Sequence, residues 1–536
     1  MKGINSVDFL KDLNPQQKVA VETIDGAVLL VAGAGSGKTK ALTHRIANIL
    51  RKEAPSNILA ITFTNKAAKE MKGRLFQLIG PQANELWIST FHSMCVSILR
   101  KDIHHLGYSK SFTILDSADQ LNVVKQIMKE LNIDIKKVEP RAVLSAISNA
   151  KNELKTPEIY GKYAGDFFQK IVLEVFEKYQ ARLKANNSVD FDDLIMLTVI
   201  LFRESNEVLN YYQGKFKYIH IDEYQDTNKA QYTLVKMLAD YHKNICVVGD
   251  TDQSIYRWRG ADIKNILSFE KDYPKAKVIM LEQNYRSTKN IINAANAVIK
   301  NNSQRKDKNL WTDNPTGKQI VLFRADNEHD EAYFVAEKIL EGIEEGKTYR
   351  DFAILYRTNV QSRIIEEVFI KSNIPYQIVG GTKFYDRKEI KDIMAYMRLI
   401  VNPDDDISLI RIINRPKRGI GITTLDKLSE YAISKQISIF SAIKEIEFVG
   451  LGSSTANKIT RFADMIIKLN QLKDSLSVTE ITEKILEETD YIEDLKNEKS
   501  LEAESRIENI NELLSVTLEF EKEKDTPTLE DFLSDV

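Results

Sequence analysis

Two polar segments, each following a short apolar run, could together bind and hydrolyse a nucleoside triphosphate. The apolar runs, 27–31 and 218–221, predict buried strands. Parallel strands of one sheet would bring the two following loops to the same edge, where α/β proteins bind their ligands. The segments are Ala32-Gly33-Ala34-Gly35-Ser36-Gly37-Lys38-Thr39 and Asp222-Glu223-Tyr224-Gln225-Asp226.

The first segment has the residue types of a phosphate cradle. Its glycines let successive backbone N–H groups point inward, and a helix that opens near Gly37 adds its positive end. Lys38 would contact the β- and γ-phosphates, and Thr39 would offer a hydroxyl to Mg²⁺. Ala32 stands where the strict pattern has glycine, so the match is a variant. The alternative is a glycine-rich turn at a helix start, without a ligand.

The second segment supplies carboxylates. Asp222 would hold Mg²⁺, directly or through water, and Glu223 would orient or deprotonate the attacking water. The alternative is an exposed acidic turn after a strand. The presence of the phosphate cradle favours the catalytic interpretation.

Composition describes a globular, soluble chain of several domains. It has 536 residues, of which 43% are hydrophobic and 28% charged, enough for about three or four domains. The net charge of −2 neither favours nor excludes nucleic acid as a partner. Cys95 and Cys246 lie in apolar surroundings, which indicates reduced thiols in a cytoplasmic protein. We expect no signal peptide and no membrane span, because no run approaches ~18 apolar residues.

Strand and helix patterns alternate up to about residue 110 and return after 190, which predicts an α/β unit with a helical insertion. Ser117 and Gln120 suggest a capping box in that insertion. A second α/β unit is predicted from near Val278, and a helical region from about 382. The strands expected in this second unit are 320–323, 352–356 and 376–379.

The order of these and further motifs resembles the superfamily 1 DNA helicases of the UvrD/Rep/PcrA type, from Leu13 to the C-terminus. The resemblance implies an α/β fold with two RecA-like P-loop NTPase cores, parallel sheets and mostly helical inserted subdomains. ATP would bind between the cores. The implied division is a first core at 1–110 and 191–279, an insertion at 111–190, the first part of a second core at 280–381 and a second insertion at 382–536.

The resemblance also implies further ATP contacts beside the cradle. Gln17 would read the adenine edge, with a helix cap as the alternative, and Tyr285 would stack on the base. Gln253 would touch the γ-phosphate, and Arg286 would act on it as an arginine finger. Lys40 stands where the family often has arginine, which keeps the charge but loses planar stacking on adenine.

Single-stranded DNA and single-strand/duplex junctions are the partners that the resemblance implies. Bases would stack on aromatic side chains, and hydroxyl and backbone N–H groups would hold phosphates. A core position is the alternative for Trp258, and a core or cap position for the residues that follow strands. The expected DNA-binding residues are Phe63, Thr64, His92, Tyr256, Trp258, Arg259, Arg357, Gly419 and Gly421.

Family members carry later segments that this sequence lacks after Gly421: a His-x-x-Lys-Gly segment and a second catalytic arginine. We therefore expect an incomplete second core. The implied function is ATP-dependent 3′→5′ helicase activity in DNA repair or replication. The alternative is a truncated fragment that binds ATP and DNA without productive unwinding.

Overall fold

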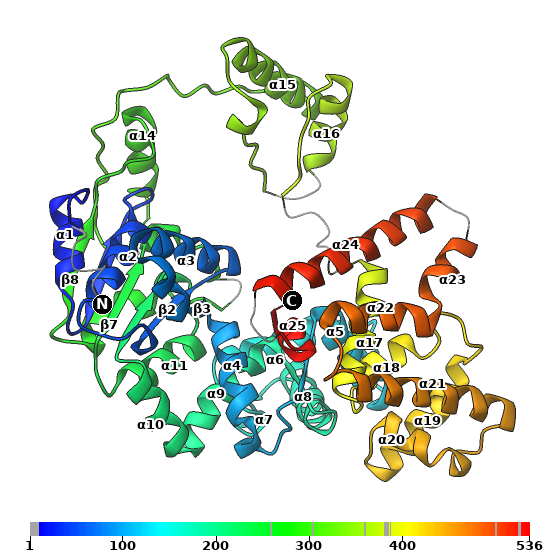
Figure 1. Cartoon of the computed structure of the whole chain (residues 1–536). Helices are drawn as coiled ribbons and strands as arrows, with labels where there is room; N and C mark the ends of the chain where they lie inside the picture. The colour runs from blue at the N-terminus through cyan, green and yellow to red at the C-terminus, as the bar shows by residue number, and fades with distance from the viewer. Residues whose placement is uncertain are drawn as a thin grey trace.

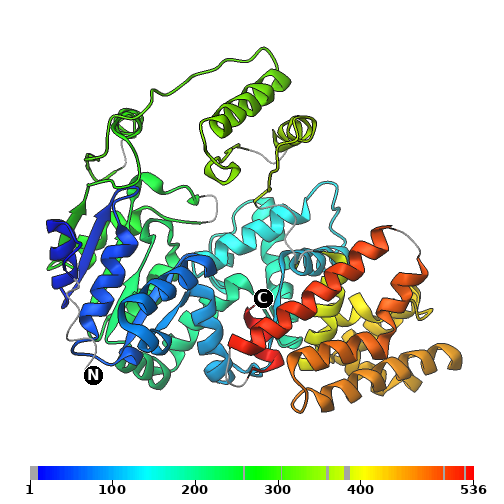
Figure 2. The same ribbon diagram turned by 45° about the horizontal axis from the view of Figure 1, so that its top comes forward.

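The structure is a computed structural model that describes residues 10–257, 260–302, 305–357, 361–379, 385, 387–498, 501–523 and 527–535. Figure 1 shows a sheet with its covering helices, an arch that carries α14 to α16, and two helical blocks that lie beside each other. In Figure 2 the arch again stands apart from the sheet.

A six-stranded parallel sheet forms the first unit, in the order β3-β2-β6-β7-β1-β8. Side chains of β1 alternate between two separate cores, with Leu29 and Val31 on one face and Val28 and Leu30 on the other. Burial on both faces explains the continuous apolar runs. The strands are β1 Val28–Ala32, β2 Ile58–Thr62, β3 Trp87–Thr90, β6 Tyr218–Ile221, β7 Ile245–Gly249 and β8 Lys277–Leu281.

Helices cover both faces of this sheet. Its two cores contain residues from before and after the 111–190 block, such as Leu99 and Leu234. The helices are α1 Pro15–Glu22, α2 Lys38–Ile49, η2 Pro55–Asn57, α3 Asn65–Ile79, η3 Gly80–Glu85, α4 Phe91–Asp102, η4 Ile103–Leu106, α9 Phe191–Glu204, α10 Asn206–Lys215, η5 Tyr224–Asp226, α11 Lys229–Ala239, η6 Thr251–Gln253, α12 Lys264–Leu267 and α13 Phe269–Asp272.

The 111–190 block has a core of its own. Two short parallel strands, β4 Thr113–Leu115 and β5 Ser188–Asp190, pair with each other where the chain enters and leaves it. The expected capping box is wrong, because Asp116 is the N-cap and its carboxylate accepts from the N–H groups of Ala118 and Asp119. The helices are α5 Ser117–Glu130, α6 Pro140–Asn152, α7 Pro157–Gly161 and α8 Phe167–Ala185.

The strand near Val278, β8, is an edge strand of the first sheet and pairs with β1, so it does not begin a sheet of its own. The three later strands are also not formed: Leu322 and Leu355 are 95% and 94% exposed. Apolar runs form strands only where neighbouring strands pair with them, and no described strand lies beside these. The helices here are α14 Lys289–Ile299, α15 Glu328–Glu344, η8 Tyr349–Asp351 and α16 Ser362–Lys371, with a small core between α15 and α16.

The region from 387 is entirely helical where it is described, and it has its own large core. It packs on the 111–190 block through polar contacts. The Asn402 amide donates to Thr113 Oγ1 over 2.9 Å, and Arg398 pairs with Asp119 at 3.1 Å. Its helices are α17 Lys388–Val401, α18 Asp406–Ile412, α19 Ile422–Lys435, α20 Ile439–Lys444, η11 Ile446–Phe448, α21 Ser453–Leu472, α22 Val478–Thr489, α23 Tyr491–Asn497, α24 Leu501–Glu523 and α25 Leu529–Asp535.

The α/β class with a parallel sheet is thus confirmed, while a second sheet is absent from the described residues. Both cysteines are buried free thiols, and burial raises the pKa of Cys95 to about 12. In the described parts of the chain, every helix is too short or too polar to cross a bilayer.

Candidate nucleotide and DNA site

The loops that carry the predicted chemistry leave the sheet at one edge. The cradle follows β1, Asp222 and Glu223 follow β6, and Asp250 follows β7, which lies between those two strands. The prediction that the first two strands share one parallel sheet is confirmed.

The cradle requires glycine at two positions where the backbone is left-handed. Gly35 has φ +66° and Gly37 has φ +78°. A Cβ on Gly35 would lie 2.6 Å from Asn284 Nδ2, so a side chain would strain the backbone and meet a packed neighbour. Gly37 is the N-cap of α2, which begins at Lys38. The loop therefore delivers a helix N-terminus to this edge.

Three successive carbonyl groups of the cradle are each held by a protein donor. Asn284 Nδ2 donates to the carbonyl of Ala34 over 2.6 Å, and the N–H of Tyr285 donates to that of Gly35 over 3.0 Å. Gln17 Nε2 donates to the carbonyl of Ser36 over 3.0 Å.

A glycine-rich loop whose carbonyls are held in this way and that leads into a helix N-terminus is suited to bind an anion. The hydroxyl of Ser36 is buried and has no hydrogen-bond partner among the described residues. A buried polar atom of this kind normally has a partner. The loop therefore fits a polyphosphate better than an empty turn.

Lys38 and Glu223 contact each other across the cradle. Lys38 Nζ lies 2.9 Å from both carboxylate oxygens of Glu223. Glu223 has φ +51°, which is uncommon for a residue with a side chain and occurs often at functional sites. Gln225 Nε2 also donates to Glu223 over 2.8 Å. In this structure the Glu223 carboxylate therefore takes the ion pair with Lys38 that a phosphate group would otherwise make.

Asp222 is the candidate magnesium ligand. Burial and, second, the charge of Glu223 raise the pKa of Asp222 to about 6. A divalent cation here would offset the two neighbouring carboxylates. Thr39 is the second residue of α2, the helix into which the cradle leads. The described residues contain no cluster of three or more His, Cys, Asp or Glu suited to a metal.

The predicted adenine contacts lie around α1. Asn14 caps this helix, and Gln17 completes a capping box while its amide also holds Ser36. The helix-cap alternative for Gln17 is therefore observed. Gln17 is 2% exposed, and its adenine role stays a prediction. Tyr285 is exposed and its hydroxyl accepts from Asn14 Nδ2 over 2.8 Å. Lys40 Nζ donates to the carbonyl of Asp12 over 2.6 Å.

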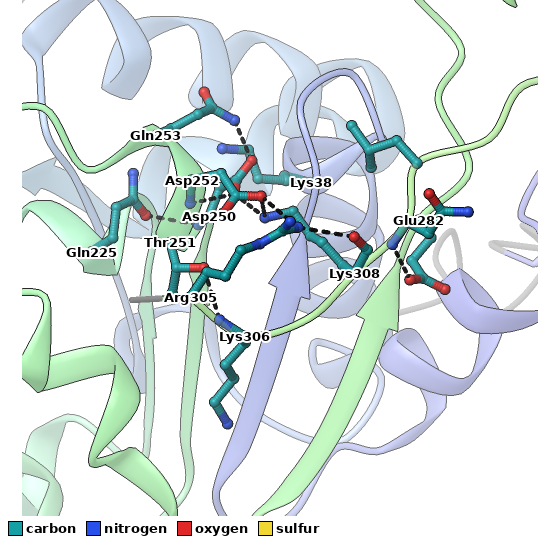
Figure 3. Close-up of polar contacts among 12 residues, drawn as sticks. Lys38, Gln225, Asp250, Thr251, Asp252, Gln253, Glu282, Arg305, Lys306 and Lys308 are labelled. Carbon is teal, nitrogen blue, oxygen red and sulfur yellow. Dashed lines mark hydrogen bonds and ion pairs between the residues drawn. The ribbon is translucent and has the colours of Figure 1, made fainter. Parts of the chain in front are cut away.

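The two predicted γ-phosphate residues lie in different loops, Arg286 beside the cradle and Gln253 after β7. Arg286 is exposed, and its Cβ lies 2.9 Å from where a Cβ on Gly35 would be. Gln253 Nε2 donates to Asp250 Oδ2 over 2.5 Å, in the loop after β7 (Figure 3). The structure thus places both residues at the nucleotide edge.

The predicted DNA residues of the first unit follow β2, β3 and β7. The rings of Phe63 and Tyr256 lie 5.1 Å apart, and Thr64 is the N-cap of α3. The His92 ring packs edge-on against Phe191, and burial lowers the pKa of His92 to about 4, so it is neutral near pH 7. Trp258 and Arg259 lie outside the described residues.

The remaining predicted DNA residues are not brought to this edge. Arg357 lies in the arch, exposed, and its N–H donates to Gln361 Oε1 over 2.9 Å. Gly419, with φ +72°, and Gly421 precede α19, and Figure 1 shows α19 away from the sheet.

Sequence reasoning missed four residues of this edge. Asn284 lies inside a motif that was recognised, but its role on the cradle was not predicted. Asp250, Arg305 and Lys308 belong to a buried ion cluster beside Gln253, in which Lys308 pairs with Asp250 and both cations pair with Asp252 (Figure 3). Arg305 and Lys308 lie in a polar stretch that looks like a surface loop, so no local signal would have found them.

Comparisons with known proteins agree with this geometry. The UvrD/REP helicase N-terminal domain matches residues 13–274, and the UvrD-like helicase C-terminal domain matches residues 279–536. The ATP-dependent DNA helicase PcrA of Bacillus subtilis is 59% identical over 99% of this chain and 72% of its own length. The PcrA proteins of Staphylococcus epidermidis and Staphylococcus aureus are each 54% identical over 98% of this chain and 73% of theirs. The chain belongs to the UvrD/REP helicase family.

Proposed function

We propose that this protein is an ATP-dependent DNA helicase that moves 3′→5′ along single-stranded DNA. The observation that carries the proposal is the cradle, whose carbonyls are held by Asn284, Tyr285 and Gln17 while Lys38 faces Glu223. An aromatic pair, Phe63 and Tyr256, follows two strands of the same sheet. Nucleotide hydrolysis and DNA contact would therefore share one rigid framework.

At the nucleotide site each residue has a distinct task. ATP·Mg²⁺ would supply the reactive phosphoryl group and the cation that neutralises its charge. Lys38 would exchange Glu223 for the phosphates, and Glu223, once released, would orient the attacking water. Asp222 and Thr39 would hold the cation, and Gln253 and Arg286 would contact the γ-phosphate from either side.

On the DNA side, aromatic rings give a platform that does not depend on base identity. Tyr256 lies three residues after Gln253 in one loop. A shift of Gln253 on loss of the γ-phosphate would therefore move Tyr256 at the DNA surface. Single-strand/duplex junctions would be held by the loops at Gly419 and Gly421. We place the activity in the cytoplasm, in DNA repair or replication.

The domain division predicted from the sequence is part of this proposal. Separate hydrophobic cores support it: the sheet has two, and the 111–190 block, the α15–α16 pair and the region from 387 have one each. Each unit could then move as a body around the nucleotide.

The test is ATP hydrolysis and strand displacement by the purified chain, with and without single-stranded DNA. We expect ATP hydrolysis that DNA accelerates, and unwinding of a duplex with a 3′ single-stranded tail. Tight binding of ATP and DNA without unwinding would support the alternative, a binding fragment. Hydrolysis that DNA leaves unchanged would count against the helicase proposal.

Phe63→Ala should weaken binding to single-stranded DNA by about 1–3 kcal/mol, with little dependence on base sequence, because a stacking surface is lost. The measurement is fluorescence anisotropy with labelled oligonucleotides of different sequence. Phe76→Ala is the matched control, since Phe76 is an exposed aromatic residue of α3 outside the ring pair. Equal affinities of wild type and Phe63→Ala would remove Phe63 from the DNA surface.

A further inference from the structure

The segment 305–312 returns to the nucleotide edge after α14, and two of its cations, Arg305 and Lys308, pair with the loop after β7 (Figure 3). The Lys308 side chain is 1% exposed, and its Nζ pairs with Asp250 and, at 2.7 Å, with Asp252 Oδ2. Arg305 Nη2 lies 3.0 Å from the same Asp252 oxygen and 2.9 Å from the carbonyl of Lys308. A lysine this deeply buried is tolerated only because both carboxylates pair with it.

Asp250, the main partner of Lys308, touches two residues that lead to the γ-phosphate. Its second carboxylate oxygen accepts from Gln253 Nε2 over 2.5 Å. Its backbone N–H donates to Gln225 Oε1 over 2.9 Å, and Gln225 Nε2 in turn donates to Glu223 over 2.8 Å. The Asp250 carboxylate thus holds the Gln253 amide, and the Asp250 backbone holds the Gln225 amide that supports Glu223.

The same segment is fastened to the cradle. The Leu310 side chain lies against Gly33, where a Cβ would meet it and force it to shift. The backbone of Leu310 is held in both directions by the Asn296 side chain, at 2.8 and 3.3 Å. The carbonyl of Trp311 accepts from the N–H of Asn284 over 2.7 Å, and Asn284 is the residue that holds Ala34. The backbone that follows Lys308 is therefore held in place against the cradle.

We propose that Lys308 is a positioning residue for ATP hydrolysis. It fixes the Asp250 carboxylate, which holds the Gln253 amide toward the γ-phosphate position in the same loop whose backbone contacts Gln225. The inference rests on the proposed function, because it assigns Lys308 a part in the hydrolysis step. A lysine with a purely structural role would instead affect folding, nucleotide binding and turnover together.

The test compares Lys308→Met with Lys306→Met. Methionine keeps most of the buried stem and removes the charge. Lys306 is the matched control, because its ammonium pairs with Glu270, outside the cluster. For Lys308→Met we expect kcat for ATP to fall about 10–100-fold, as is typical when a supporting partner of a catalytic group is lost. KM for ATP and the affinity for single-stranded DNA should stay within about threefold of wild type.

Removal of one buried charge can also destabilise the fold, so a second variant is included. Lys308→Met with Asp250→Asn removes both charges of the main pair and leaves no unpaired carboxylate at that position. If the double variant melts at the wild-type temperature, we expect its kcat to fall as in Lys308→Met while its KM for ATP stays close to wild type. Wild-type kcat in this double variant would overturn the inference. So would a loss of kcat and nucleotide affinity in parallel with melting temperature in both variants.

The wild-type protein separates this inference from the proposed function. If wild type hydrolyses ATP in response to DNA while both Lys308 variants keep its kcat, only the positioning role is wrong. If wild type shows no hydrolysis at all, the proposed function fails, and the positioning role fails with it.

Discussion

Lys38→Ala should abolish tight binding of ATP·Mg²⁺, whereas Glu223→Gln should keep binding and lower turnover by about 10²–10⁴-fold, the usual contribution of general base catalysis. Lys38 is the cradle's lysine, and its ammonium cannot be replaced by the backbone N–H groups alone. Glutamine keeps the shape of Glu223 but cannot accept a proton. The two substitutions therefore separate binding from chemistry.

The ion pair between Lys38 and Glu223 sharpens this prediction. Lys38 Nζ lies 2.9 Å from both Glu223 oxygens, so ATP must displace the carboxylate to reach the lysine. Glu223→Gln removes that competing charge, and its affinity for ATP should equal or exceed that of wild type. If Lys38 served only to neutralise Glu223, the Lys38→Ala variant would keep the ATP affinity of wild type.

Calorimetric titration with a slowly hydrolysed ATP analogue and Mg²⁺ measures the binding, and single-turnover hydrolysis measures the chemistry. Lys52→Ala is the control, since Lys52 is a partly exposed lysine of the same unit that pairs with Asp25. Equal loss of affinity in the Lys38 and Glu223 variants would contradict the role given to Glu223.

The parts of the fold that were predicted correctly are those where local pattern and burial agree. The runs that became β1 and β6 are buried on both faces. An apolar run of this kind, broken only by His220 in β6, predicts a central strand or a core helix, and the short length favoured the strand. Residues 320–323 have a similar pattern but no described strand beside them. The strand preference of such a run depends on its neighbours, which a sequence does not display.

The residues of the candidate site likewise fall into those that a local motif predicts and those that it does not. The cradle and the acidic segment could be predicted because each is a short motif whose chemistry lies within a few consecutive residues. Asn284, which holds the cradle through Ala34, and Lys308, which holds Asp250, act across long stretches of chain. Gln17 shows a third case, because its amide serves the helix cap and the cradle instead of being left to solvent.

The second large effect is expected at Arg286. Arg286→Ala should lower kcat for ATP by about 10³–10⁵-fold, the range over which an arginine finger acts in phosphoryl transfer. The guanidinium would carry the spread negative charge of the transition state, so its loss should affect kcat far more than ATP affinity. Lys289→Ala, in the first turn of α14, is the control for loss of a nearby surface cation.

The local structure makes Arg286 a clean position for this test. The side chain is exposed, and the hydrogen bond that shapes the loop uses its backbone N–H, which donates to Asn284 Oδ1 over 2.9 Å. Alanine keeps that N–H, so Asn284 should continue to hold the cradle and ATP should still bind. Arg286→Lys should recover only part of the rate, because an ammonium keeps the charge but lacks the planar fork. Full activity in Arg286→Ala would mean that another cation completes the site, while loss of ATP binding would assign Arg286 to the cradle itself.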